Sequence, residues 1–166
     1  MMPGNAGGGK SSLKEMNEKL KGLLDAVRRP DRFRGELGET LLITPLPGSI
    51  PAKRLLIIGL GDSKSFSPER MQFVGEVLYT ESERIGAAHP YFAPTVLDGG
   101  ISRFATGEVA EQVITGFTRA IETQRVLHDA HASNAKGVKA LTYLAGAKNL
   151  GSTRDGIYRA ITAARK

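Results

Sequence analysis

The segment 59–63, with the sequence Gly-Leu-Gly-Asp-Ser, is the part of this chain best suited to bind a ligand. It directly follows a short apolar run, and open α/β sheets bind ligands at the carboxyl ends of their strands. Glycines there let backbone N–H groups approach a phosphate. Gly59, Gly61, Asp62 and Ser63 are therefore candidate ligands for the phosphate of a nucleotide or an ADP-ribose-like molecule. A plain strand-exit turn is the alternative, because Lys64 stands where a dinucleotide-binding fingerprint has its third glycine.

The sequence offers no set of side chains for metal or nucleophilic catalysis. It has no cysteine, which excludes thiolate nucleophiles, disulfides and cysteine-based zinc sites. Its aspartates are scattered, whereas a two-metal hydrolase needs several carboxylates around ions about 3.5–4 Å apart. His128 and His131 could share a helix face, but the end of a helix explains them without a metal. We expect no catalytic residue, no bound metal and no cofactor.

A second candidate surface is basic. The formal net charge is +6, and the excess is concentrated in the C-terminal third of the chain. Such a surface attracts nucleic acid and other polyanions. The residues that could form it are Lys136, Lys139, Lys148, Arg154 and Arg159. A solvated surface without a partner is the alternative, and nucleic-acid binding ranks behind the phosphate hypothesis.

Periodicity predicts the elements that position these residues. Apolar residues at spacings of three and four predict helices over 13–27, 68–88 and 106–130, and a last helix from Ser152 or Thr153. Short apolar runs predict strands at 41–43, 54–58, 92–97 and 138–144, the third ended by Asp98-Gly99-Gly100. Pro- and Gly-rich sequence between the first two strands indicates a turn, so these strands are expected to be antiparallel neighbours.

The order α-β-β-α-β-α-β-α indicates an α/β fold with a mostly parallel sheet covered by helices on both faces. At 166 residues, the chain fits a single domain. We expect residues 1–11 to form a flexible Gly-rich leader and residues 12–166 to form the domain. The start of the chain lacks the apolar core of a signal peptide, and no apolar run is long enough to span a bilayer. We expect a cytoplasmic protein without membrane contact.

Three segments together resemble a known family. They are Leu23-Leu24-Asp25-Ala26, the run from Phe33 to Thr40 (Phe-Arg-Gly-Glu-Leu-Gly-Glu-Thr), and the run from Lys53 to Gly61 that ends in Gly-Leu-Gly. This ordered combination is similar to the amino-terminal domain of the leucyl aminopeptidases, peptidase family M17. The resemblance covers roughly residues 12–145.

The resemblance implies a macro-domain-like, three-layer αβα sandwich with one antiparallel pair in its sheet. In the full enzymes, it also implies a separate carboxyl-terminal domain with two metal ions, assembly into hexamers and, in some bacterial members, DNA binding. The metal-binding motif Asn-Thr-Asp-Ala-Glu-Gly-Arg is absent from this sequence. We therefore expect a stand-alone, non-catalytic relative that serves as an interaction or regulatory module.

One departure from the family concerns the first strand of the sheet. The family's domain opens with a strand, whereas residues 2–9 of this chain are Gly-rich and poorly suited to one. A missing outer strand exposes unpaired backbone N–H and C=O groups that invite pairing with another chain. We therefore expect self-association, as a homodimer.

Overall fold

The computed structural model describes residues 12–29, 31–96 and 101–165. The expected leader at 1–11 and the expected Asp98-Gly99-Gly100 turn lie outside these ranges. The helices are α1 (Ser12–Lys19), α2 (Leu23–Val27), α3 (Arg70–Arg84), α4 (Thr106–Asp129) and α5 (Leu150–Ala164), with short 3-10 helices η1 (Ser63–Ser65) and η2 (Ala147–Asn149). The strands are β1 (Thr40–Ile43), β2 (Leu55–Ile58), β3 (Tyr91–Phe92) and β4 (Thr142–Tyr143). None of the helices in the described ranges is long and apolar enough to cross a membrane.

The strands form two small sheets rather than one. β1 and β2 pair antiparallel, with Thr40 opposite Ile58 and Ile43 opposite Leu55, which confirms the predicted antiparallel neighbours. β3 and β4 pair parallel, with Tyr91 opposite Thr142. The prediction of a mostly parallel sheet is therefore wrong for the described residues, in which only one of the two pairs is parallel.

The third and fourth strands are much shorter than predicted. The segment before β4 runs alongside the segment before β3. Two backbone hydrogen bonds join them, from the N–H of Lys139 to the carbonyl of Ala88 and from the N–H of Thr142 to the carbonyl of Pro90. Proline has no N–H to donate, so Pro90 and Pro94 restrict regular pairing on either side of β3. The expected strands at 92–97 and 138–144 are thus mostly extended chain with few ladder hydrogen bonds.

The predicted helix over 13–27 is two helices. The break falls at Lys21 and Gly22, both with positive φ, of 54° and 79°. Glycine adopts that conformation at little cost, and Gly22 precedes the first residue of α2. The side chain of Asn17 holds the corner, because its Oδ1 accepts from the N–H of Leu24 at 2.9 Å and its Nδ2 donates to Asp25 at 2.7 Å. The periodic apolar face continues across the corner, which explains the single-helix prediction.

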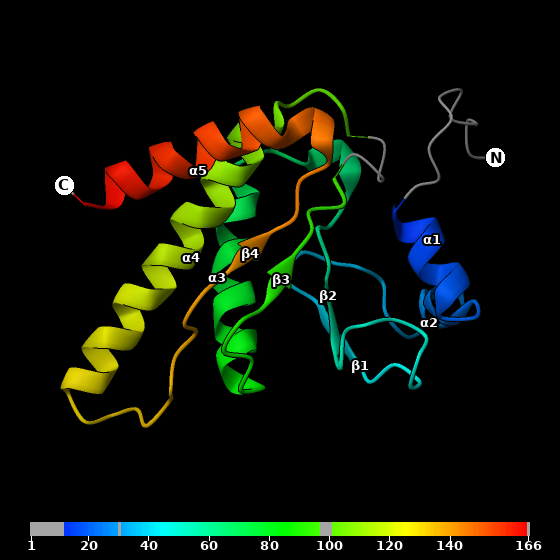
Figure 1. Ribbon diagram of the computed structural model, residues 1–166, viewed down its shortest axis with the longest axis horizontal. Coiled ribbons are helices and arrows are strands. Elements are labelled where there is room, and N and C mark those ends of the chain that lie inside the picture. Colours follow the sequence, from blue (N-terminus) through cyan, green and yellow to red (C-terminus); the bar gives the residue numbers. More distant parts are fainter. Residues whose placement is uncertain (1–11, 30, 97–100, 166) are drawn as a thin grey trace.

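The hydrophobic core lies on both faces of β2. Leu55 and Ile57 pack with α1 and α2 around buried Leu20 and Leu24. Ile58, on the opposite face of the strand, packs against the larger cluster built from α3, α4 and β3. Figure 1 shows α1 and α2 beside β1 and β2, with α3, α4 and α5 grouped at the other end of the molecule. Successive side chains of a strand point to opposite faces, and β2 carries apolar residues on both. Helices therefore cover β2 from both sides.

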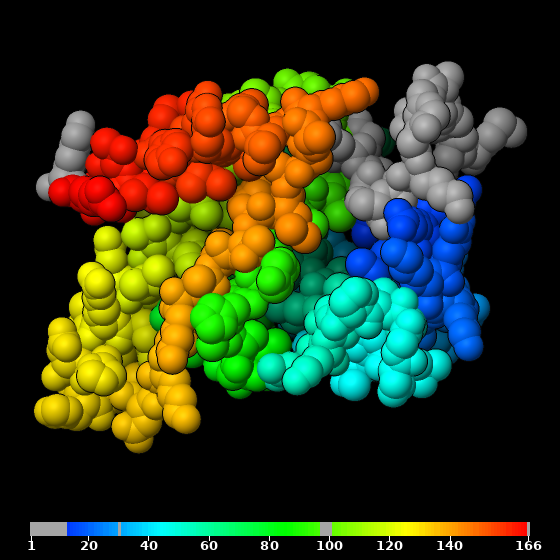
Figure 2. All heavy atoms as spheres, viewed as in Figure 1, coloured from blue at the N-terminus to red at the C-terminus, as the bar shows by residue number. Residues whose placement is uncertain are grey.

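The packing of α3, α4 and α5 brings helix backbones close together. A Cβ built on Gly116 in α4 would lie 2.6 Å from the carbonyl carbon of Gln72 in α3. Buried Met71, Val74 and Val113 fill the space around this contact. In Figure 2, α5 runs across the outside of the molecule above α4. This arrangement leaves one side of α5 facing solvent.

Candidate functional site

The Gly59–Ser63 segment lies against the loop at 34–39. The N–H of Gly59 donates to the carbonyl of Glu39 at 2.7 Å, and the N–H of Gly61 donates to the carbonyl of Gly35 at 2.9 Å. A Cβ on Gly59 would lie 2.5 Å from the carbonyl carbon of Gly35, so only glycine fits this approach. Both amides that were candidates for a phosphate are thus engaged within the chain.

Asp62 and Ser63 complete a turn. The Asp62 carboxylate accepts from the N–H of Lys64 at 3.0 Å and caps η1. The guanidinium of Arg103 donates to the carbonyls of Ser63 and Phe66, at 3.3 and 2.9 Å. The geometry accounts for these residues as a strand-exit turn, and a phosphate ligand here stays a prediction that would depend on the exposed side chains of Ser63 and Lys64.

Glu39 organises the loop that faces Gly59. Its carboxylate accepts from the N–H of Arg34 and from the N–H of Glu36, each at 3.0 Å. Burial acts to raise the pKa of Glu39, but backbone N–H donors of Glu36, Arg34 and Gly35 together outweigh it and hold the pKa below the ordinary carboxyl value. The two halves of the sequence block that resembles the M17 family are therefore joined by backbone hydrogen bonds and one carboxylate.

The five candidate basic residues do not form one uniform face. Lys136 and Lys139 lie in the segment between α4 and β4, which in Figure 1 rises from the lower end of α4, while α5 crosses above β4. Lys148 lies in η2, next to α5. Arg159 in α5 pairs with Glu111 in α4 at 2.7 Å, and Arg154 lies 3.3 Å from its neighbour Asp155. The cations are thus divided between two regions and partly neutralised.

An exposed apolar surface on α5 was not among the predicted sites. Leu150, Tyr158 and Ile161 are 61%, 62% and 37% exposed, and their spacing of eight and three residues places them on one side of the helix. We call these three residues the α5 apolar face. Another side of α5 packs on α4 through buried Gly156 and Ala160. The helical spacing was visible in the sequence, but which side of the helix is covered was not.

The structure does not place His128 and His131 on a shared helix face. Both are exposed at the end of α4, and His131 follows the helix with a positive φ of 54°. They therefore do not sit on one continuous helix face. Among the described residues, no group of three or more His, Cys, Asp or Glu side chains is placed to hold a metal ion.

These elements define a mixed α/β domain. Residues 5–129 match the family model of the cytosol aminopeptidase family, N-terminal domain. The chain therefore belongs to this family, through the family's amino-terminal domain.

Curated relatives and a solved structure agree with this assignment. The chain is 28% identical over 128 residues to a probable cytosol aminopeptidase of Alkaliphilus metalliredigens, covering 72% of this chain and 25% of the relative. It is 27% identical to a probable cytosol aminopeptidase of Roseiflexus castenholzii, covering 89% of this chain and 30% of the relative. A tomato leucine aminopeptidase mutant superimposes with a TM-score of 0.58 at 18% identity, over 92% of this chain and 29% of that one. The chain thus spans between a quarter and a third of these relatives.

Proposed function

We propose that this chain is a non-catalytic interaction module that associates with a second copy of itself through the α5 apolar face. The observation that carries the proposal is the exposure of Leu150, Tyr158 and Ile161 on one side of a well-packed helix. Single exposed apolar residues are common on protein surfaces, whereas an aligned group is typical of an interaction site. Tyrosine in particular is enriched at interfaces.

A second copy suits this face because the face is short and linear. In a two-fold dimer the same patch is used by both partners, so two α5 helices can cross and bury all six side chains. The charges at the face are compatible with this arrangement, since Arg154, which is exposed between Leu150 and Tyr158 on the same side of α5, is followed by Asp155 of opposite sign. Antiparallel crossing of two such helices allows each arginine to meet the other copy's aspartate.

The fold proposed for the module is the macro-domain-like, three-layer αβα arrangement implied by the family. The helices on both faces of β2 support it, as does the superposition on a leucine aminopeptidase. A cytosolic location is proposed with it, on the strength of the relatives' name. Peptidase activity is not proposed, because the match lies in the amino-terminal domain of the family.

Light scattering at tens of micromolar chain tests the association. We expect a mass near twice the 17.8 kDa of one chain. Tyr158→Glu places a charge in the centre of the face and is expected to give single chains. The matched control is Leu42→Lys, which alters a 43% exposed side chain on β1, an edge strand of its two-stranded sheet, and is expected to leave the dimer intact.

Two results contradict the proposal. Wild-type protein that stays at the mass of one chain up to about 100 μM has no such interface. Dissociation by Leu42→Lys but not by Tyr158→Glu instead places the contact at the β1 edge of its sheet, which agrees with the general expectation of pairing through a sheet edge but not with the α5 apolar face.

The non-catalytic part of the proposal has its own assay. Purified chain is incubated with leucine amides and added manganese or zinc, and no turnover is expected. Metal-dependent hydrolysis that follows the protein through repeated purification would show that the chain carries an active site.

A further inference from the structure

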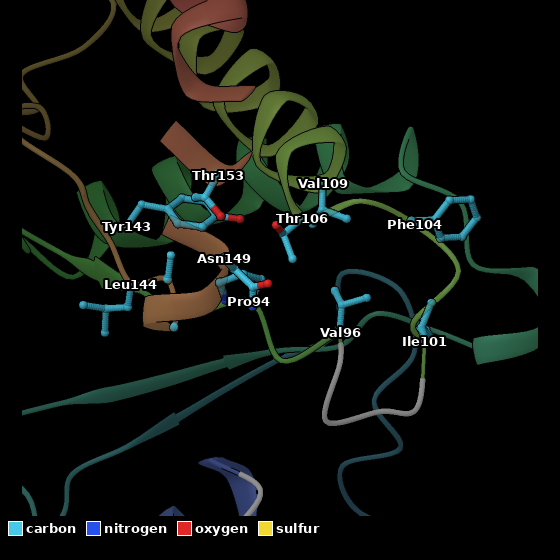
Figure 3. A pocket seen from close by; sticks show the side chains of 12 residues that line it. Pro94, Val96, Ile101, Phe104, Thr106, Val109, Tyr143, Leu144, Asn149 and Thr153 are labelled. Atoms are coloured by element: carbon cyan, nitrogen blue, oxygen red, sulfur yellow. The ribbon is translucent and has the colours of Figure 1, made fainter. Parts of the chain in front are cut away.

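A cavity of about 60 Å³ lies where β3 and β4 end. Its walls come from the chain after each strand, from the first turn of α4 and from the start of α5. In Figure 3 the side chains of Tyr143 and Thr153 lie toward one end of the cavity and those of Ile101 and Phe104 toward the other, with Thr106 between them beside Val109. The cavity is distinct from the Gly59–Ser63 turn and from the α5 apolar face.

One hydroxyl group on the cavity is buried without a partner. The Tyr143 hydroxyl has no hydrogen-bond partner in the described chain. Thr153, which is only 4% exposed, lines the same cavity. Buried polar groups in folded proteins are almost always hydrogen-bonded. The unpartnered Tyr143 hydroxyl therefore indicates that something else satisfies it.

The helices that carry Thr106 and Thr153 are locked together at their ends. The N–H of Gly107 in α4 donates to the Ser152 hydroxyl of α5 at 3.0 Å. A Cβ on Gly156 would lie 2.7 Å from the carbonyl carbon of Gly107, so the two backbones touch directly. Thr106 and Thr153 are neighbours of these contact residues in sequence. Their positions on the cavity wall are therefore set by rigid elements, which favours a preformed site.

The lining determines the charge of the occupant. Among the described lining residues none carries a charged side chain, and Asn149 adds an amide beside the hydroxyls. Burial raises the pKa of Tyr143 far above its ordinary value, so the phenol stays neutral. An ion moved among these described residues would lose its hydration without gaining a counter-charge from them, which is costly. The chemistry therefore fits an uncharged group that can donate and accept hydrogen bonds.

We propose that this cavity binds the uncharged head of a small ligand, a primary amide or an aliphatic alcohol of about three to five non-hydrogen atoms. The size follows from the volume, since a cavity of about 150 Å³ holds benzene and about 10–15 Å³ suffices for one water. The head would hydrogen-bond to Thr153 and Tyr143, while its alkyl part contacts Val96 and Val109. This site is independent of the interaction function proposed above.

A titration followed by two-dimensional amide NMR tests the site with probes of one size. Propionamide and propan-1-ol are the neutral probes, and propionate and propylammonium are their charged counterparts. We expect saturable shifts at residues lining the cavity with the neutral probes only. Thr153→Val keeps the shape of the side chain and removes the hydroxyl, and we expect it to weaken binding about fivefold to tenfold, as for the loss of one neutral hydrogen bond.

Two further variants separate binding from folding. Tyr143→Phe removes an unpartnered hydroxyl, so we expect weaker probe binding together with an unchanged or higher melting temperature. Thr162→Val, on the same helix, is the matched control, because Thr162 is exposed and its hydroxyl bonds only to the carbonyl of Tyr158 at 2.8 Å. It is expected to leave binding unchanged.

Three outcomes overturn the proposal. The first is an absence of saturable shifts with both neutral probes up to about 100 mM, which would leave water as the only occupant. The second is tighter binding of propionate than of propionamide, which would make the cavity an anion site. The third is equal weakening by Thr153→Val and Thr162→Val.

Discussion

The carbonyl group of Gly107 in α4 occupies the space that a side chain on Gly156 in α5 would need. This single contact lets the two helices touch backbone to backbone. It also brings the Ser152 hydroxyl within hydrogen-bonding distance of the Gly107 backbone nitrogen, 3.0 Å away. The first N–H groups of a helix have no acceptor within that helix, and α5 supplies an acceptor for one of them here. The wall of the cavity depends on the same contact.

Replacing Gly156 by alanine should therefore destabilise the protein. The added methyl group overlaps backbone rather than a flexible side chain, and such overpacking costs about 1–3 kcal/mol. Gly151→Ala in the same helix is the control, because nothing lies within 4 Å of the added Cβ and alanine is the better helix former. Urea denaturation followed by circular dichroism measures both. Equal stabilisation by the two variants would mean that α4 and α5 are not in backbone contact.

Gly59 is the next position at which a methyl group should not be tolerated. A Cβ there would overlap the backbone of Gly35 and Glu36, and the resulting shift would break the hydrogen bond from Gly59 to Glu39. We expect Gly59→Ala to lower the free energy of unfolding by about 1–3 kcal/mol. Chemical denaturation checks this value. A neutral result would argue that the segment is not held against the 34–39 loop.

Glu39 should make stability depend on acidic pH. Its pKa in the folded protein lies below the ordinary carboxyl value of 4.5, so the unfolded chain takes up a proton first as the pH falls. The stabilisation is therefore fully present above pH 4.5 and is lost as the pH falls through the lower folded pKa. Thermal melts between pH 3 and 7 should show a shallower acid decline for Glu39→Gln than for the wild type. Parallel curves would show that the carboxylate contributes nothing.

A screen of nucleotides and ADP-ribose is expected to give no thermal shift. The reason is that the N–H groups of Gly59 and Gly61 already donate to backbone carbonyls. A phosphate would have to displace these bonds or use only exposed side chains. A ligand present at 100 times its dissociation constant adds about 2.7 kcal/mol to stability, which a melt detects readily. A shift that Ser63→Ala abolishes would instead support the phosphate hypothesis, and Ser102→Ala on an exposed loop serves as its control.

The sequence predicted the element types better than their extents. Long amphipathic patterns such as 106–130 correspond to α4, since a period between three and four residues matches the turn of a helix and not the two-residue repeat of a strand. The strands near 92 and 142 were predicted too long. An apolar run shows which residues can be buried, but it does not show where inter-strand hydrogen bonds stop, and a proline has no backbone N–H to donate to a neighbouring strand. The corner at Lys21 and Gly22 was missed because the apolar face continues through it.

Local chemistry in the sequence determined the family, the antiparallel pair and the turn after β2. These depend on short-range patterns of glycine, proline and apolar residues, which act within a few residues of one another. Only the tertiary structure decided that the amides of Gly59 and Gly61 are occupied, that one side of α5 is bare, and that Tyr143 and Thr153 share a cavity. Each of these depends on which distant backbone comes to lie against a given residue. Close packing sets those contacts through the whole fold, and no local spacing encodes them.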